Sequence, residues 1–77
     1  TIGHDVIIED YCTIAPGVNI SGNVKIREGA KLGTGVTVLP GLTVGRWSVI
    51  GAGGVVTRDI PDHVIAVGIP ARVIRST

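Results

Sequence analysis

Aromatic residues are nearly absent from this 77-residue sequence, which contains one tryptophan, one tyrosine and no phenylalanine. Because 44% of the residues are nevertheless hydrophobic, a core in this chain must be built mainly from aliphatic side chains. Cysteine is equally scarce, since Cys12 stands alone and no internal disulfide can form. A chain without disulfides is compatible with a reducing compartment, so we expect a cytoplasmic protein.

A strong excess of one charge and long apolar runs are also lacking. Seven basic and six acidic residues give a net charge of +1, which argues against a nucleic-acid binder driven by charge. No apolar run approaches the roughly 18 residues of a membrane span. We therefore expect neither nucleic acid nor a membrane as a partner. A modest basic cluster is interpreted as a solvated face, with a phosphate-bearing ligand as the alternative; it comprises Lys25, Arg27 and Lys31.

What the sequence does contain is a strict repeat of six residues. An aliphatic residue returns at every sixth position without a gap: Ile2, Ile8, Ile14, Ile20, Ile26, Leu32, Val38, Val44, Ile50 and Val56. This period is neither the 3.6 of a helix nor the 2 of an isolated strand, and hexapeptide repeats are typical of a parallel β-helix.

The other positions of the repeat describe one flat side of a prism. Four residues after each aliphatic residue the side chain is small or aliphatic, and only Ser48 is polar, which suits a second inward position. Three residues after it, eight of ten positions hold Gly, Asn or Asp, the residues that adopt positive φ most readily at a tight corner. Three such sides, one hexad each, close one coil, and successive coils stack roughly 4.8 Å apart. Residues 1–60 then form about three coils with a column of buried aliphatic residues from Ile8 to Val44.

Two corners break the Gly, Asn and Asp rule. Tyr11 and Trp47 occupy one column of the predicted prism, with Gly29 between them. We interpret the two rings as contacts to a neighbouring subunit or a further domain, and stacking on a purine ring is the alternative. Cys12 falls at an inward position and is interpreted as a buried structural thiol.

One corner carries a candidate catalytic group. His4 lies two residues after an aliphatic residue, at an outward corner, and Asp5 is adjacent to orient or polarise its ring. Gly22 lies one coil further on and has no side chain to shield its amide. A neutral imidazole can accept a proton near neutral pH, although solvent-exposed histidines beside carboxylates are common and need no function.

A strip of small residues offers a candidate ligand track. Gly33-Thr34 and Gly51-Ala52 are separated by three hexads, one full coil, and are hence stacked. An extended ligand can hydrogen-bond to backbone amides along such a strip, and the alternative is that small residues simply suit the corner. Beyond residue 60 the repeat ends, and we expect a turn at Pro61-Asp62, a strand at 64–67 and a final turn and strand. His63 is predicted to be a solvated loop residue.

The repeats and the segments after them carry a resemblance to a known family. The hexads, followed by Val-Thr-Arg-Asp-Ile-Pro-Asp (56–62) and Gly-Ile-Pro-Ala-Arg-Val-Ile (68–74), resemble the C-terminal part of hexapeptide-repeat acyltransferases. Residues 2–11, Ile-Ala-Pro-Gly (14–17) and Ser-Gly-Asn-Val-Lys-Ile (21–26) are similar to the branch that acetylates bacterial sialic acids or the amino groups of nucleotide-linked sugars. The resemblance implies an all-β, left-handed parallel β-helix for residues 1–60 with a short extension at 61–77. It also implies a homotrimer and an N-terminal nucleotide-sugar-binding domain that this sequence does not contain.

The resemblance further implies roles for single residues. His4 matches the family's catalytic base, and Asp5 stands where relatives often carry a glutamate. Gly22 matches an amide near the thioester oxygen of acetyl-CoA, the acyl donor, while Thr34 and Ala52 match positions that line it. No metal is implied.

The implied reaction is direct transfer of an acetyl group from acetyl-CoA to a sugar amine or hydroxyl. Thr13 departs from the pattern, since a relative has a second histidine there that contacts acetyl-CoA. Alternatives are a serine- or maltose-type O-acetyltransferase of the same superfamily and a non-catalytic β-helix module. A zinc carbonic anhydrase of this fold requires three histidine ligands, and the chain has only His4 and His63.

Overall fold

The computed structural model describes residues 1–77 and contains eleven β-strands and no helix. The first nine strands are two residues long and recur every six residues: β1 (Ile7–Ile8), β2 (Thr13–Ile14), β3 (Asn19–Ile20), β4 (Lys25–Ile26), β5 (Lys31–Leu32), β6 (Thr37–Val38), β7 (Thr43–Val44), β8 (Val49–Ile50) and β9 (Val55–Val56). The last two are longer: β10 (Val64–Val67) and β11 (Arg72–Ser76). No helix is present that is long and apolar enough to cross a membrane.

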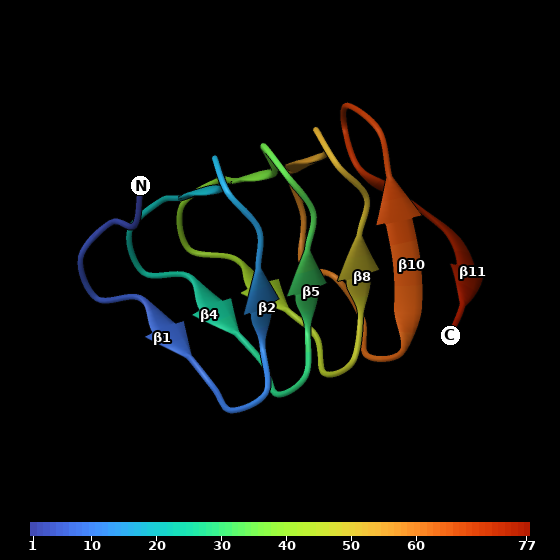
Figure 1. Ribbon diagram of the computed structural model, residues 1–77, viewed down its shortest axis with the longest axis horizontal. Coiled ribbons are helices and arrows are strands. Elements are labelled where there is room, and N and C mark those ends of the chain that lie inside the picture. The colour runs from blue at the N-terminus through green and yellow to red at the C-terminus, as the bar shows by residue number, and fades with distance from the viewer.

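The strands form the three walls of a prism. Each strand pairs in parallel with the strand one coil further on, as in Ile8 with Ile26 and Ile26 with Val44. The walls are β1-β4-β7, β3-β6-β9 and β2-β5-β8, and β10 and β11 extend the last one. In Figure 1 the strands of the near wall run upward while the coils advance from left to right, which makes the superhelix left-handed. The predicted left-handed parallel β-helix of about three coils is therefore confirmed.

The corners between the walls form three edges that run along the prism. The histidine edge comprises residues 4–5, 22–23 and 40–41, the aromatic edge residues 10–11, 28–29 and 46–47, and the small-residue edge residues 16–17, 34–35 and 52–53. Nine of the ten predicted corner residues have positive φ, and the prediction is wrong only at Asp59, where the repeat ends. His63 is exposed and lies in the turn before β10, as predicted. It also takes the next place on the aromatic edge, with a φ of 56° and an N–H donated to the Arg46 carbonyl at 2.8 Å.

The core is the predicted aliphatic column, but it is open at its first coil. The inward residues of the inner coils have at most 2% of their surface exposed: Ile20, Ile26, Leu32, Val38, Val44, Ile50 and Val56. The predicted burial is wrong for Ile8, which is 39% exposed, and only partial for Ile14. Both side chains lie in the first coil of residues 1–77, at one end of the column. Full burial of one such side chain stabilises the fold by about 1.5–3 kcal/mol, so the inner coils carry most of the stability.

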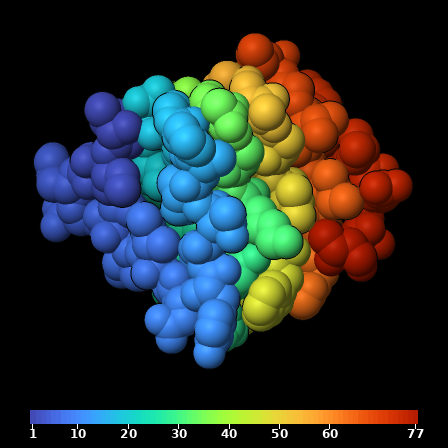
Figure 2. All heavy atoms as spheres, in the orientation of Figure 1, coloured from blue at the N-terminus to red at the C-terminus, as the bar shows by residue number.

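The C-terminal extension adds two strands to the end of one wall and does not form a separate layer. β10 pairs in parallel with β8, with Ile65 opposite Val49, and β11 then pairs antiparallel with β10. Figure 2 shows the result as successive bands of colour along the prism, with the extension at the C-terminal end. The strand predicted at 64–67 is confirmed.

Candidate active site

The histidine edge brings together the first two predicted site residues. His4 Nδ1 lies 3.2 Å from Asp5 Oδ2, and the two side chains are 89% and 76% exposed. The next coil holds this corner in place, because the Asn23 N–H donates to the His4 carbonyl at 3.1 Å. A proton on Nδ1 is donated to the carboxylate, which leaves Nε2 as the proton-accepting nitrogen. An imidazole that is oriented in this way can accept a proton from a bound group.

Gly22 is the third predicted residue at this edge. A Cβ atom added to Gly22 would lie 3.9 Å from His4 Cε1 and 3.3 Å from the His4 carbonyl oxygen. A larger side chain at position 22 would therefore contact the imidazole, and glycine leaves the space beside the ring open. The Gly22 N–H donates no hydrogen bond within the chain. A free amide next to a base is suited to stabilising an oxyanion.

Thr34 and Ala52 stack on the small-residue edge, as predicted. The Gly53 N–H donates to the Thr34 carbonyl at 2.8 Å, which fixes the spacing of the two corners. Gly33 is required beside them, because a Cβ atom there would lie 2.7 Å from the Ala52 nitrogen. The N–H groups of Thr34 and Ala52 donate no hydrogen bond within the chain. This edge therefore presents a row of free amides.

The aromatic edge differs beyond its first coil, because the outward amides there already have partners. The Glu28 N–H donates to Glu9 Oε1 at 2.9 Å, and the Arg46 N–H donates to Asp62 Oδ1 at 2.8 Å. Beyond the first coil, the edges with free outward amides are thus the two that carry the predicted site residues, whereas on the aromatic edge only the first coil leaves such an amide free, at Asp10. Nothing in the repeat indicates this difference, since all three edges obey the same period.

The two groups of site residues do not meet within one chain. The histidine edge and the small-residue edge are separate corners of the prism, and the wall β3-β6-β9 lies between them. The basic cluster is also divided: Lys25 lies on β4 and Lys31 on β5, which belong to different walls, and Arg27 Nε lies 3.2 Å from Glu9 Oε1. Thr13 lies on β2 beside Lys31, on the outer surface.

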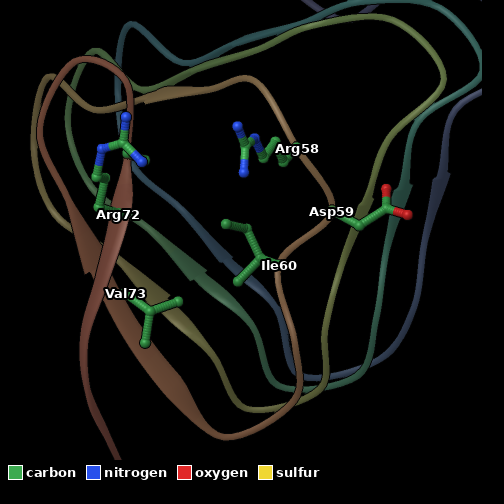
Figure 3. Close-up of a pocket in the computed structure, with 6 residues that line it drawn as sticks. Arg58, Asp59, Ile60, Arg72 and Val73 are labelled. Carbon is green, nitrogen blue, oxygen red and sulfur yellow. The ribbon is translucent and has the colours of Figure 1, made fainter.

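Sequence reasoning missed a pair of arginines at the C-terminal end. Arg58 and Arg72 line a hollow of about 290 Å³ above Ile60, and neither forms an ion pair with a carboxylate. Figure 3 shows both guanidinium groups in this hollow, with the Asp59 side chain pointing away from them; Asp59 Oδ1 accepts the Thr43 N–H at 2.9 Å. Two guanidinium groups without a counter-charge suit a phosphate. The spacing of the two residues in the sequence does not follow the period of six.

Comparisons with known proteins agree with this arrangement. Residues 23–58 match the bacterial transferase hexapeptide (six repeats) family. The galactoside O-acetyltransferase of Lactococcus lactis is 52% identical over 59 residues, which cover 77% of this chain and 28% of that protein.

Two solved structures superpose closely on the chain. The acetyltransferase domain of PglB from Neisseria gonorrhoeae, in complex with acetyl coenzyme A, has a TM-score of 0.94 and 38% identity over 96% of this chain and 36% of that chain. A mutant of perosamine N-acetyltransferase from Caulobacter crescentus, in complex with CoA and GDP-perosamine, has a TM-score of 0.88 and 43% identity over 90% of this chain and 33% of that chain.

The repeat, the three parallel walls and the free corner amides define a hexapeptide-repeat β-helix. The family match covers residues 23–58, and the chain is similar over most of its length to acetyltransferases that share this fold. It spans about a third of the length of the relatives that it matches.

Proposed function

We propose that this chain is the acetyl-transfer part of an acetyl-CoA-dependent acetyltransferase that acts on an amine or hydroxyl of a bacterial sugar. The observation that carries the proposal is the His4–Asp5 pair beside the unshielded, unpaired amide of Gly22. Two further observations support it. The superposed Neisseria domain binds acetyl coenzyme A, and the Caulobacter enzyme binds CoA and GDP-perosamine.

The geometry supports direct attack by the acceptor, without an acyl-enzyme. His4 Nε2 accepts the proton of the acceptor amine or hydroxyl as that group attacks the thioester carbonyl carbon, and Asp5 stabilises the imidazolium. The Gly22 N–H donates to the oxyanion of the tetrahedral intermediate. The intermediate then expels the CoA thiolate, which takes the proton from His4. A general base contributes about 10²–10⁴-fold, and one oxyanion donor about 10²–10³-fold.

An acyl-enzyme on the only cysteine is disfavoured. Cys12 is partly buried, and its Sγ donates to the Arg27 carbonyl at 3.1 Å. Burial raises the pKa of the Cys12 thiol, so little of the nucleophilic thiolate forms near neutral pH. Direct attack by the acceptor fits this environment better than a covalent intermediate.

The remaining features support a proposed position for the acyl donor and a proposed contact with a second subunit. The free amides of Thr34 and Ala52 suit the extended pantetheine arm, and the Arg58–Arg72 hollow suits a phosphate of the same molecule. Because the histidine edge and the small-residue edge of one chain are apart, a site that uses both needs two copies of the chain. A ring of three copies, in which one edge meets the other edge of its neighbour, repeats this contact and closes. The cytoplasmic location stays a prediction.

The test compares His4→Ala and Asp5→Asn in the protein that contains this chain. His4→Ala should lower kcat by roughly 10²–10⁴-fold and leave acetyl-CoA binding nearly unchanged, because His4 is placed against the acceptor. Asp5→Asn should lower kcat less, since it orients the ring and takes no proton. Near-normal turnover of His4→Ala with the best acceptor would show that His4 is only an exposed histidine.

An acceptor panel separates the alternatives. A nucleotide-linked amino sugar and a sialic acid represent the proposed class, whereas serine, maltose and a galactoside represent O-acetyltransferases of the same superfamily. The similarity to a galactoside O-acetyltransferase favours including sugar hydroxyls. Turnover of serine alone would contradict the sugar assignment, and no turnover by an intact protein that binds acetyl-CoA would favour a non-catalytic module.

A further inference from the structure

Two bulky residues occupy strained corners on the aromatic edge. Tyr11 and Trp47 have φ values of 65° and 56°, in the left-handed region that β-carbon-bearing residues avoid. Glycine fills six positions of positive φ elsewhere in the chain and adopts this conformation without such strain. Tyr11 is also 75% exposed, so packing of its ring within the chain offsets little of the energy of this backbone strain. Strain held at an exposed position points to a contact outside the chain.

Trp47 is supported from beneath by a glycine. A Cβ atom added to Gly29 would lie 2.2–2.5 Å from three atoms of the six-membered ring of the indole. The ring therefore lies directly over the Gly29 backbone, and Trp47 remains 45% exposed. The indole is held on one side by the protein and is open to solvent on the rest of its surface.

A polar hollow adjoins the two aromatic residues. It has a volume of about 360 Å³, and all of its lining side chains are charged: Glu9, Asp10, Glu28 and Arg46. Asp10 and Arg46 directly precede Tyr11 and Trp47 in the sequence, so the hollow and the rings share one edge. Glu9 is fixed in the lining by Arg27 and by the Glu28 N–H. The hollow thus offers hydrogen-bond acceptors and a donor, and no apolar anchor point.

We propose that the aromatic edge binds a saccharide, with the C–H face of a pyranose ring on the exposed rings of Trp47 and Tyr11 and its hydroxyl groups in the charged hollow. Aromatic side chains provide apolar contact area beside polar partners, and ligand sites combine such surface with a few placed polar groups. The guanidinium of Arg46 opposes a simple cation, and the three carboxylates oppose a phosphate. The charged lining of the hollow disfavours a hydrophobic side chain of a protein partner in that hollow.

This site is distinct from the proposed catalytic edge. The wall β1-β4-β7 separates the aromatic edge from His4, Asp5 and Gly22. The saccharide is therefore held outside the reacting centre, and the inference goes beyond the proposed function. Loss of acetyl transfer in His4→Ala should leave this binding unchanged, so the two proposals fail separately.

The test uses Trp47, the only tryptophan of the sequence, as its own reporter. The fluorescence of Trp47 is followed while galactose, N-acetylglucosamine or maltose is titrated, with choline and adenosine monophosphate as the cationic and the planar anionic probe. We expect a saturable change with at least one saccharide and none with choline or adenosine monophosphate. No saturable change with any saccharide, or saturation by choline or the nucleotide alone, overturns the proposal.

Matched variants place the binding on this edge. Tyr11→Asn removes the ring but keeps a residue that tolerates positive φ, so it should raise the melting temperature while saccharide binding becomes about 2- to 10-fold weaker, as one lost aromatic contact predicts. Glu28→Gln should also weaken binding, because the hollow loses a charged acceptor. Lys31→Ala, on another wall, is the control and should bind as the unmodified protein does. Binding that persists unchanged in both Tyr11→Asn and Glu28→Gln contradicts the assignment.

Discussion

The contact between Trp47 and Gly29 predicts a difference between two otherwise equivalent glycine substitutions. Gly29 and Gly35 share a φ of 72°, so Gly→Ala has the same backbone effect at both, about 1–2 kcal/mol. A Cβ atom at Gly35 meets nothing within 4 Å, whereas at Gly29 it would lie 2.2 Å from Trp47 Cε3. The indole must move, and overpacking of this kind adds about 1–3 kcal/mol. Gly29→Ala should therefore destabilise the fold by roughly 2–5 kcal/mol and Gly35→Ala by about 1–2 kcal/mol.

Urea unfolding followed by circular dichroism measures both changes. The larger one is serious for a domain of this size, whose unfolding free energy is on the order of 4–12 kcal/mol. Trp47→Asn provides the decisive background, because it removes the indole and keeps a residue suited to positive φ. In that background the two alanine substitutions should have equal effects. Equal effects with Trp47 present, or a difference that persists without it, would refute the contact between the indole and Gly29.

The arginine pair, the hydrogen bonds of Glu9 and the thiol each lead to a further prediction. Arg58→Ala and Arg72→Ala should each raise the KM for acetyl-CoA by roughly tenfold, the value of one hydrogen bond to a charged group, with kcat nearly unchanged and Arg75→Ala as the exposed control; an unaltered KM excludes the phosphate site. Partial desolvation raises the pKa of Glu9, but hydrogen bonds from the Glu28 N–H and Arg27 lower it below its usual 4.5. The stabilisation is therefore complete above that value and is lost as the pH falls through the lowered pKa. Glu9→Gln should accordingly flatten the acid limb of a plot of unfolding midpoint against pH. Cys12→Ala should retain acetyl transfer, and an inactive but folded variant would indicate an acyl-enzyme.

The repeat of six predicts the architecture because each residue of the hexad meets one physical demand. Ile20 and Val38 are aliphatic and are buried in a column away from water, and Gly35 adopts positive φ at a corner. A sequence that repeats this pattern ten times in succession is compatible with few other folds. The period also stacked Gly22 on His4 and Ala52 on Thr34, since stacking follows from sequence spacing alone.

The errors lie where the repeat stops or where side chains choose partners. Ile8 occupies the same position of the hexad as every other inward residue, but the exposure of its side chain depends on what packs beneath the first coil. The exposed position of His63 was predicted, but its place on the aromatic edge was not, because it follows Trp47 by slightly less than one full coil. The approach of Arg72 to Arg58 depends on a backbone bond from the Ala71 N–H to the Val55 carbonyl at 2.7 Å, which no spacing rule contains.

The constant separation of one coil between paired strands has a kinetic consequence. Closing a flexible loop of that length has an entropic penalty of roughly 2–3 kcal/mol, and the penalty is the same for each coil. Once one coil has paired with another, its exposed strand edges can pair with the strands of the next coil, which lie at the same separation along the chain. Structure therefore propagates from each coil to its neighbour, as in other repeat arrays. Folding can then begin among the well-packed inner coils and extend toward both ends.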